Sequence, residues 1–214
     1  MKTAKGWFWP DADQFMVNEL KEDGSYQGSH LTEALRFVTD FSVALDGGAH
    51  VGTWSRTLSS RFKQVVAVEP SGDTYEALCA NMRQFGCANV DAKRAALGDA
   101  LGRVQMAIET KAQAMENTGA RFVKPGNDVI MLTIDGMDLQ SLGFLKLDVE
   151  GSEYAALNGA RDTLARCQPV VLFENKFLWK RYGVPRDAPQ QLLTGLGYRK
   201  ASSVSKDEIW VRAR

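Results

Sequence analysis

Apolar and polar positions follow two different periods along this chain. Short runs such as residues 65–68 are apolar throughout, which is typical of strands buried on both faces. Longer segments such as 73–85 place Leu78, Met82 and Phe85 at helical spacing. Their alternation predicts a doubly wound α/β fold, a mostly parallel sheet with helices on both faces. Strands are expected at 41–45, 65–68, 90–97, 130–134, 144–149 and 170–173, and helices at 54–62, 73–85, 152–166 and 188–196.

Three regions depart from this alternation. The last two strands, 198–201 and 208–212, are joined by a short polar link, which predicts an antiparallel C-terminal hairpin. Residues 98–128 hold one candidate strand and a polar, turn-rich stretch, so we expect an inserted hairpin or loop that could cover a site. Residues 1–40 show no clean period before a short helix near Thr32, and we expect an N-terminal extension or lid. Residues 1–214 are therefore predicted to form a single domain.

Composition and charge narrow the classes of protein that fit. The 26 basic and 26 acidic residues give a formal net charge of +0, which does not favour a nucleic-acid partner. The three cysteines have unrelated spacings, which is typical of free thiols in a reducing compartment. No apolar run reaches the roughly 18 residues that a membrane span needs, and no apolar segment follows the basic N-terminus. We expect a cytoplasmic protein without a membrane partner.

A glycine-rich loop, Asp46-Gly47-Gly48-Ala49-His50-Val51-Gly52, follows the first strand of the predicted sheet. In a doubly wound sheet this turn faces the ligand crevice, and glycines let the backbone approach a ligand closely. Ala49 replaces the second glycine of the dinucleotide fingerprint, so a nicotinamide oxidoreductase is disfavoured. Glu69 ends the next strand about 20 residues further on, where a carboxylate can accept the ribose hydroxyls of an adenosine-containing ligand.

Acidic residues end two later strands. Asp148 and Glu150 follow a strand that we place beside the first one, at the point where the strand order reverses, and side chains at i and i+2 point the same way. Glu150 could instead serve the first turn of the helix near Ser152. Glu174, followed by Asn175, ends the next strand at the same rim. These carboxylates are candidates for proton transfer or for binding a cation.

Together these segments resemble the FkbM family of S-adenosylmethionine-dependent methyltransferases, over roughly residues 40–175. The most specific part is Lys-Leu-Asp-Val-Glu-Gly-Ser-Glu at 146–153. The resemblance implies a seven-stranded Rossmann-like sheet and methylation of a hydroxyl on a sugar or secondary metabolite. Trp9-Pro10-Asp11 with Tyr26-Gln27, and Asn117-Thr118-Gly119, look like segments of one branch of the family that flank the cofactor and substrate from outside the core sheet. The cofactor-binding residues would be Asp46, Gly47, Gly48, Ala49, His50, Gly52, Glu69, Pro70, Ala96 and Asp148.

A hydroxyl acceptor needs a proton acceptor or a metal ion. We expect Asp148 to be the base, with Glu174 second and Glu150 a further candidate, and no metal. The alternative is a Mg²⁺ held by Asp148, Glu174 and Asn175. A small molecule or glycan is the expected partner, and a homodimer is compatible with this prediction. Two other functions stay open, a methyltransferase for protein or nucleic acid and a non-catalytic cofactor-binding module.

Overall fold

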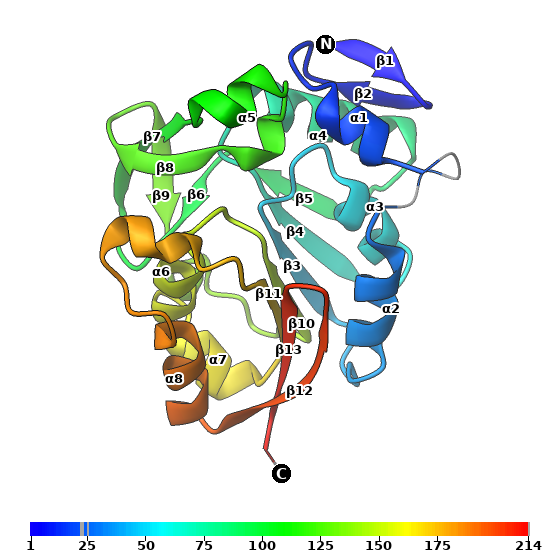
Figure 1. The fold of residues 1–214 in the computed structure, drawn as a ribbon. Helices are drawn as coiled ribbons and strands as arrows, with labels where there is room; N and C mark the ends of the chain where they lie inside the picture. The colour runs from blue at the N-terminus through cyan, green and yellow to red at the C-terminus, as the bar shows by residue number, and fades with distance from the viewer. Residues whose placement is uncertain (22–23, 25, 214) are drawn as a thin grey trace.

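A seven-stranded sheet forms the centre of the molecule (Figure 1). The computed structural model describes residues 1–21, 24 and 26–213. The strand order is β12-β13-β11-β10-β3-β4-β5, and β13 alone runs antiparallel to its two neighbours, β11 and β12. The predicted fold class is confirmed, including the antiparallel C-terminal hairpin. The strands are β3 (Val43–Gly47), β4 (Gln64–Val68), β5 (Val90–Lys93), β10 (Phe144–Leu147), β11 (Val170–Glu174), β12 (Tyr198–Val204) and β13 (Asp207–Arg212).

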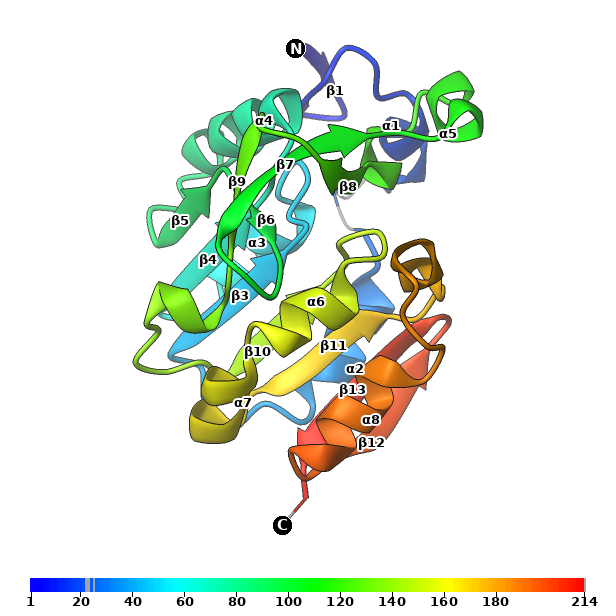
Figure 2. The ribbon, with the colours of Figure 1, turned by 90° about the vertical axis from the view of Figure 1, so that its left-hand side faces the viewer.

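Helices cover both faces of this sheet because its strands are apolar on both sides. Ala44 and Phe144 pack toward one face with Trp54 of α3, while their chain neighbours Leu45 and Leu145 pack toward the opposite face. Figure 2 shows the second face in front, with α2 and α3 behind the strands. The first face carries α2 (Gly28–Leu35), α3 (Thr53–Ser59) and α4 (Gly72–Gln84), and the second carries α6 (Glu153–Asn158), α7 (Arg161–Cys167) and α8 (Ala188–Gly195).

The single strand expected at 90–97 is wrong, because this segment forms two strands in different sheets. The chain turns after β5, and β6 (Ala96–Leu97) enters a separate four-stranded sheet of order β6-β9-β7-β8. Within the inserted segment 98–128, β7 (Gly102–Ala107) pairs antiparallel with β8 (Phe122–Pro125). The strand expected at 130–134 is β9 (Val129–Leu132), and it also belongs to this second sheet. Two short helices, α5 (Thr110–Ala114) and η1 (Thr118–Ala120), connect β7 to β8.

The helix expected at 152–166 is divided into α6 and α7 at Gly159. The carbonyl of Gly159 accepts the Asp135 N–H at 2.9 Å, so the helical hydrogen bonds are interrupted there. A side chain at Gly159 would place its Cβ 2.1 Å from the Gly98 carbonyl oxygen. Asp135, in η2 (Asp135–Met137), then accepts backbone N–H groups of Asp162 and Thr163 at the start of α7. The break between α6 and α7 is therefore set by tertiary contacts, which cannot be predicted from helical periodicity.

The N-terminal segment packs beside the loop that follows β3. Its hairpin, β1 (Lys2–Ala4) and β2 (Trp7–Trp9), and α1 (Phe15–Glu19) lie against α4. Asn81 of α4 joins the N-terminal hairpin to the loop that follows β3. Its side-chain amide accepts the Phe8 N–H and donates to the carbonyls of Phe8 and Val51. The helix α2 begins at Gly28, earlier than the expected start near Thr32. The N-terminal segment is thus fixed next to the candidate cofactor loop.

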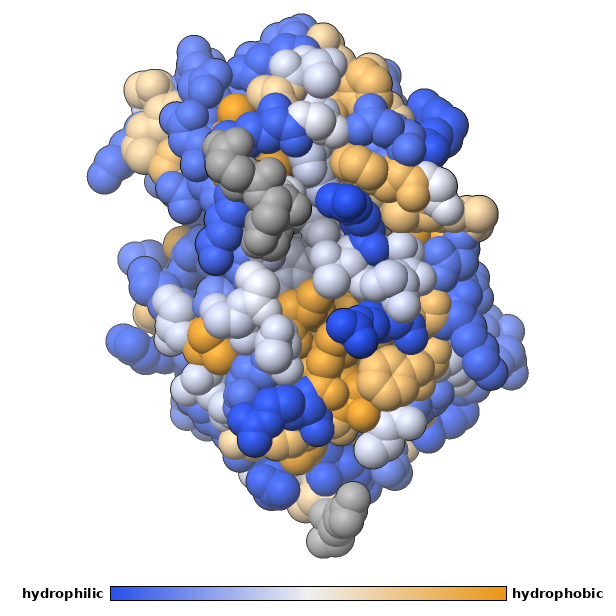
Figure 3. Space-filling view, turned by 90° about the vertical axis from the view of Figure 1, so that its right-hand side faces the viewer, coloured by the Kyte–Doolittle hydropathy of each residue, from blue (hydrophilic) through white to orange (hydrophobic). Residues whose placement is uncertain are grey.

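The surface is mostly hydrophilic on the face that lies to the right in Figure 1, with a larger apolar area in the lower half of the view and smaller ones near the top (Figure 3). Phe41 is the large apolar side chain exposed between α2 and β3, at 39%. Among the helices of the described residues, none combines the length and the apolar character that crossing a bilayer requires.

A buried ion pair joins the two central strands, β3 and β10. Asp46 lies opposite Lys146 in the parallel register, and the Lys146 Nζ is 2.9 Å from Asp46 Oδ1. Asp46 is fully buried, and Ser55 of α3 donates to its second oxygen at 2.7 Å. Lys146 also donates to the Gly48 carbonyl at 3.0 Å. Burial disfavours the ammonium, but the charge and hydrogen bond of Asp46, together with the charge of Asp148, outweigh burial and raise the pKa of Lys146.

We expect Lys146→Met to destabilise the protein by about 3–5 kcal/mol, because Asp46 would be left as an unpaired buried charge. Urea unfolding followed by circular dichroism measures this change. Lys63→Met, at an exposed position, is the matched control and should shift the unfolding free energy by less than about 0.5 kcal/mol. Adding Asp46→Asn to Lys146→Met should recover part of the loss, and a double variant less stable than the single one would contradict this account.

Candidate functional site

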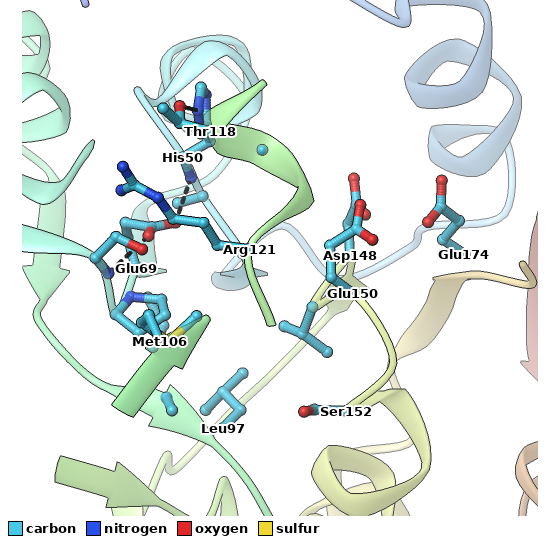
Figure 4. A pocket seen from close by; sticks show the side chains of 18 of the residues that line it. His50, Glu69, Leu97, Met106, Thr118, Arg121, Asp148, Glu150, Ser152 and Glu174 are labelled. Atoms are coloured by element: carbon cyan, nitrogen blue, oxygen red, sulfur yellow. Dashed lines mark hydrogen bonds between the residues drawn. The ribbon is translucent and has the colours of Figure 1, made fainter. Parts of the chain in front are cut away.

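A cavity of about 150 Å³ opens at the carboxyl ends of the central strands. It lies where the strand order reverses, with β4 on one side of β3 and β10 on the other, which is the predicted location for a ligand in this fold. Figure 4 shows Glu69, His50 and Arg121 on one side of the cavity and Asp148, Glu150 and Glu174 on the other. The loop after β3 and the ends of β4, β10 and β11 provide most of these groups.

The glycine-rich loop passes against the loop that follows β10. Gly48 has a φ of +75°, and a Cβ there would lie 1.9 Å from the Asp148 carbonyl oxygen, so only glycine fits. Gly48, Ala49 and His50 line the cavity. Gly47 and Gly52 do not line it and instead pack against apolar side chains of the core. Of the predicted glycine contacts, the structure therefore places Gly48 alone at the cavity.

Asp46, which the sequence predicted to bind the cofactor, does not reach the cavity. Its side chain is fully buried, it does not line the cavity, and its oxygens accept from Lys146 and Ser55. The structure therefore corrects the assignment of Asp46 as a ligand-contacting residue. Asp46 acts on the loop indirectly, because the same Lys146 ammonium binds the Gly48 carbonyl.

Glu69 is held in one orientation by local hydrogen bonds. Its Oε1 accepts from the Ser71 N–H and the Thr74 hydroxyl, both at 2.9 Å. Its Oε2 accepts the His50 N–H at 3.0 Å, and a carboxylate oxygen has room for a further donor. Pro70 and Ala96 line the cavity next to it. This side of the cavity therefore combines a fixed carboxylate acceptor with the apolar side chains of Pro70 and Ala96.

His50 uses its side chain within the protein. Its Nε2 lies 2.8 Å from the Thr118 hydroxyl and 3.0 Å from Asp13 Oδ2. Asp13 is fully buried; burial works against its charge, but contacts with His50 and Thr118 keep its pKa below the usual value. Sequence reasoning missed Asp13, because nothing in the order of residues connects it to His50. His30, the other histidine, lies 3.4 Å from Asp207 and does not line the cavity.

Three carboxylates and one lysine gather on the opposite side. Oxygens of Asp148, Glu150 and Glu174 lie within 4.8 Å of one another, as expected from their strand ends. The Lys176 Nζ is 2.7 Å from Glu174 and 3.4 Å from Glu150. Lys176 also lines the cavity.

Glu150 does not serve the helix that follows it, contrary to the alternative considered above. The loop N–H groups of Val149 and Gly151 donate to Glu153, at 3.2 and 3.1 Å. Glu153 is almost fully buried, and burial raises its pKa to about 7. Glu150 is therefore free to face the cavity, and its own φ of +50° belongs to the turn that Glu153 stabilises.

The set of oxygen ligands proposed for Mg²⁺ is not assembled as expected. The Asn175 amide donates to Glu208 at 3.0 Å, and Asn175 does not line the cavity. Glu150 takes its place, so the groups that could hold a cation are Asp148, Glu150 and Glu174. Lys176 already supplies a positive charge to two of them.

Aromatic side chains complete the wall near the carboxylates. Tyr26 and Trp54 both line the cavity, and the Trp54 indole donates to Gln27 at 3.0 Å. Asn117, Thr118 and Gly119 line it from the inserted segment. Trp7 and Trp9, in contrast, are buried in the N-terminal core, as expected for packing residues.

A model of the methyltransferase FkbM domain matches residues 46–200 of the sequence. The match starts at the glycine-rich loop and ends in β12, so it includes both sides of the cavity. No curated protein matches the sequence.

Solved structures share the fold at low sequence identity. Methyltransferase FkbM from Methylobacillus flagellatus KT has 16% identity and a TM-score of 0.53 over 80% of this chain and 43% of that one. This chain therefore spans less than half the length of that protein. Precorrin-6y C5,15-methyltransferase from Geobacter metallireducens GS-15 has 13% identity and a TM-score of 0.49, with 87% of each chain covered. An S-adenosylmethionine-dependent methyltransferase from Aquifex aeolicus has 13% identity and a TM-score of 0.45, with 93% of each covered.

We expect Glu174→Gln to make the protein relatively more stable as the pH rises. Burial raises the pKa of Glu174 to about 8, Asp148 acts in the same direction and Lys176 opposes it. In the unfolded chain the pKa returns to about 4.5, so between these values the native state binds more protons and loses stability with increasing pH. Glutamine does not titrate and avoids this loss.

Urea unfolding of both proteins at pH 4.5 and pH 8 tests this expectation. The free-energy difference between variant and wild type should grow by at least about 1 kcal/mol over that range. Glu76→Gln, at an exposed position of α4, should leave the difference constant. A constant difference for Glu174→Gln as well would show that Glu174 titrates normally.

Proposed function

We propose that this chain, which belongs to the FkbM methyltransferase family, transfers the methyl group of S-adenosylmethionine to a hydroxyl of a sugar or another small metabolite. One observation carries the proposal. A single cavity at the strand-order reversal joins a side suited to adenosine, with Glu69, to a side with carboxylates that can take up a proton. Both are needed for methyl transfer to a neutral hydroxyl.

The charges in the cavity favour this cofactor over a dinucleotide. The carboxylates of Asp148 and Glu150 outnumber the ammonium of Lys176, so the site favours a cationic ligand. A sulfonium carries a positive charge, whereas the pyrophosphate of NAD would be repelled. The N–H groups of Gly48 and Ala49 are not available to a phosphate, because both donate to the Val68 carbonyl at 3.0 Å. The residues therefore fit S-adenosylmethionine, with Glu69 toward the ribose and Pro70 and Ala96 toward the adenine.

The protein's part in the reaction is to position the acceptor and remove its proton. S-adenosylmethionine supplies, when bound, an electrophilic methyl group that an acceptor oxygen takes up. Asp148 is the proposed base, because among the described residues no ion pair involves its carboxylate. Glu174 is the second choice; with a pKa raised to about 8 by burial it holds its proton at neutral pH, which makes it a poor acceptor there. Glu150 and Lys176 would orient the acceptor.

A small polar acceptor suits the walls of this side of the cavity. Aromatic rings such as Trp54 and Tyr26 can stack on the apolar face of a sugar, and carboxylates can accept hydrogen bonds from its hydroxyls. Phosphate groups of a nucleic acid would meet the carboxylates of Asp148 and Glu150 and be repelled. These features support a hydroxylated small molecule or glycan as the acceptor.

Calorimetry with the two cofactors tests the first part of the proposal. We expect S-adenosylmethionine to bind and NAD to show no heat above dilution, because the cavity favours a cation. Glu69→Gln should weaken binding of S-adenosylmethionine about tenfold, since the ribose would lose a charged acceptor. Binding of NAD alone would refute the cofactor assignment.

Asp148→Asn tests the base. Once an acceptor is found among sugars and small alcohols, turnover should fall by about 10²–10⁴-fold, because general-base catalysis contributes an effect of that size. Binding of S-adenosylmethionine should stay within a few-fold of wild type. Glu76→Gln is the matched carboxylate control, and turnover unchanged in Asp148→Asn would exclude Asp148 as the base. Loss of turnover with a chelator, restored by Mg²⁺, would instead support a metal ion.

A further inference from the structure

Three segments far apart in the sequence meet at the side chain of His50. The ring Nε2 contacts Asp13 Oδ2 at 3.0 Å and the Thr118 hydroxyl at 2.8 Å, and the Thr118 hydroxyl donates to the same Asp13 oxygen. Asp13 belongs to the N-terminal segment, His50 to the glycine-rich loop and Thr118 to the inserted segment. One buried carboxylate oxygen therefore joins both outer segments to the cofactor loop. Figure 4 shows the contact between His50 and Thr118.

The Asp13 carboxylate is itself rigidly held. Its side chain is fully buried, and its other oxygen accepts the Met16 N–H at 3.1 Å. Burial opposes its charge, but His50 and Thr118 lower its pKa, so it stays ionised. Removing either partner would leave a buried charge poorly satisfied. The three side chains therefore behave as one unit.

A short path leads from Asp13 to the proposed ribose acceptor. His50 has a φ of +51°, a left-handed conformation that few residues other than glycine adopt. The Asp13 contact anchors its ring in that conformation, and its backbone N–H then donates to Glu69 Oε2 at 3.0 Å. Losing the anchor would release the loop conformation and with it one of the three hydrogen bonds that orient the Glu69 carboxylate, the only one of them on Oε2.

The same contacts hold a cover over the cavity. Met16 and Phe15 of the N-terminal segment and Asn117 to Gly119 of the inserted segment line the cavity from outside the main sheet. Their backbones are also joined, since the N–H groups of Gln14 and Phe15 donate to the Glu116 carbonyl at 3.0 and 3.3 Å. The two terminal nitrogens of the Arg121 guanidinium, Nη1 and Nη2, donate to the Asp73 carboxylate of α4. This contact holds the inserted segment after Gly119 against α4.

We infer that Asp13 is a positioning residue for the cofactor. Acting through His50, it orients Glu69 and keeps the residues around Met16 and Thr118 closed over the cavity. Binding of the cofactor and closure of this cover are thereby coupled, because both depend on the same buried carboxylate. The inference rests on the proposed function, since it assigns a role toward S-adenosylmethionine.

Calorimetry on a small set of variants tests the inference. Asp13→Asn should raise the Kd for S-adenosylmethionine at least tenfold, because the amide carries no negative charge toward His50 and its NH2 group cannot accept the Met16 N–H as the second carboxylate oxygen does. Thr118→Val, of similar shape, should raise it severalfold, and Thr118→Ser, which keeps the hydroxyl, should restore near wild-type binding. Asp11→Asn is the matched control, because Asp11 is exposed and pairs with the N-terminal ammonium.

Two further readouts separate positioning from a general loss of structure. With an acceptor in hand, Asp13→Asn should raise the KM for S-adenosylmethionine and leave kcat within about threefold at saturation, since no group that touches the acceptor changes. Hydrogen exchange at Gln14 and Phe15 should slow when S-adenosylmethionine binds to the wild type, and less so in the variant. If Asp13→Asn does not fold, the comparison of Thr118→Val with Thr118→Ser still tests the inference.

The outcomes are distinguishable. Absence of S-adenosylmethionine binding to the wild type would overturn the proposed function and this inference together. Wild-type binding with Asp13→Asn and Thr118→Val within twofold of it would overturn the inference and leave the function standing. An equal fall of kcat and kcat/KM in Asp13→Asn would also overturn it, because the residue would then act on the chemical step and not on the cofactor.

Discussion

The buried pair of Asp46 and Lys146 is the contact on which the site depends. It joins β3 to β10 at the point where the strand order reverses, and the same ammonium binds the Gly48 carbonyl. A charge in that position requires a partner, because an unpaired carboxylate in the core is strongly unfavourable. The two central strands and the loop are thus fixed together, and the loop after β10 can pass closely over Gly48.

The two sides of the cavity differ in how their carboxylates are satisfied. Glu69 has hydrogen-bond donors on both oxygens, all from the chain immediately around the loop and α4. Glu150 and Glu174 share the single Lys176, and burial raises the pKa of both. The first arrangement gives a fixed acceptor for a ligand. The second leaves excess negative charge, which a cationic ligand would stabilise and which proton transfer can use.

The segments outside the seven-stranded sheet complete the cavity. The N-terminal segment reaches it through Phe15 and Met16, and the inserted segment reaches it through Thr118 and Arg121. The N-terminal segment alone could not satisfy the buried Asp13 carboxylate. Its side-chain partners are His50 of the glycine-rich loop and Thr118 of the inserted segment. The fold of the central sheet therefore provides the position of the site, and the outer segments provide its enclosure.

The sequence by itself determined the sheet, its helical layers and the strand ends that bear Glu69, Asp148 and Glu174, because local periodicity and the geometry of parallel strands decide these. Contacts between distant segments decided the rest: the second sheet, the break at Gly159, the internal role of Asp46 and the meeting of Asp13 with His50. From the sequence alone, a polar residue in a strand or loop is known only to need a hydrogen-bond or ion-pair partner if it is buried. Which partner it has depends on the packing of the whole chain, and a linear pattern contains no record of that packing.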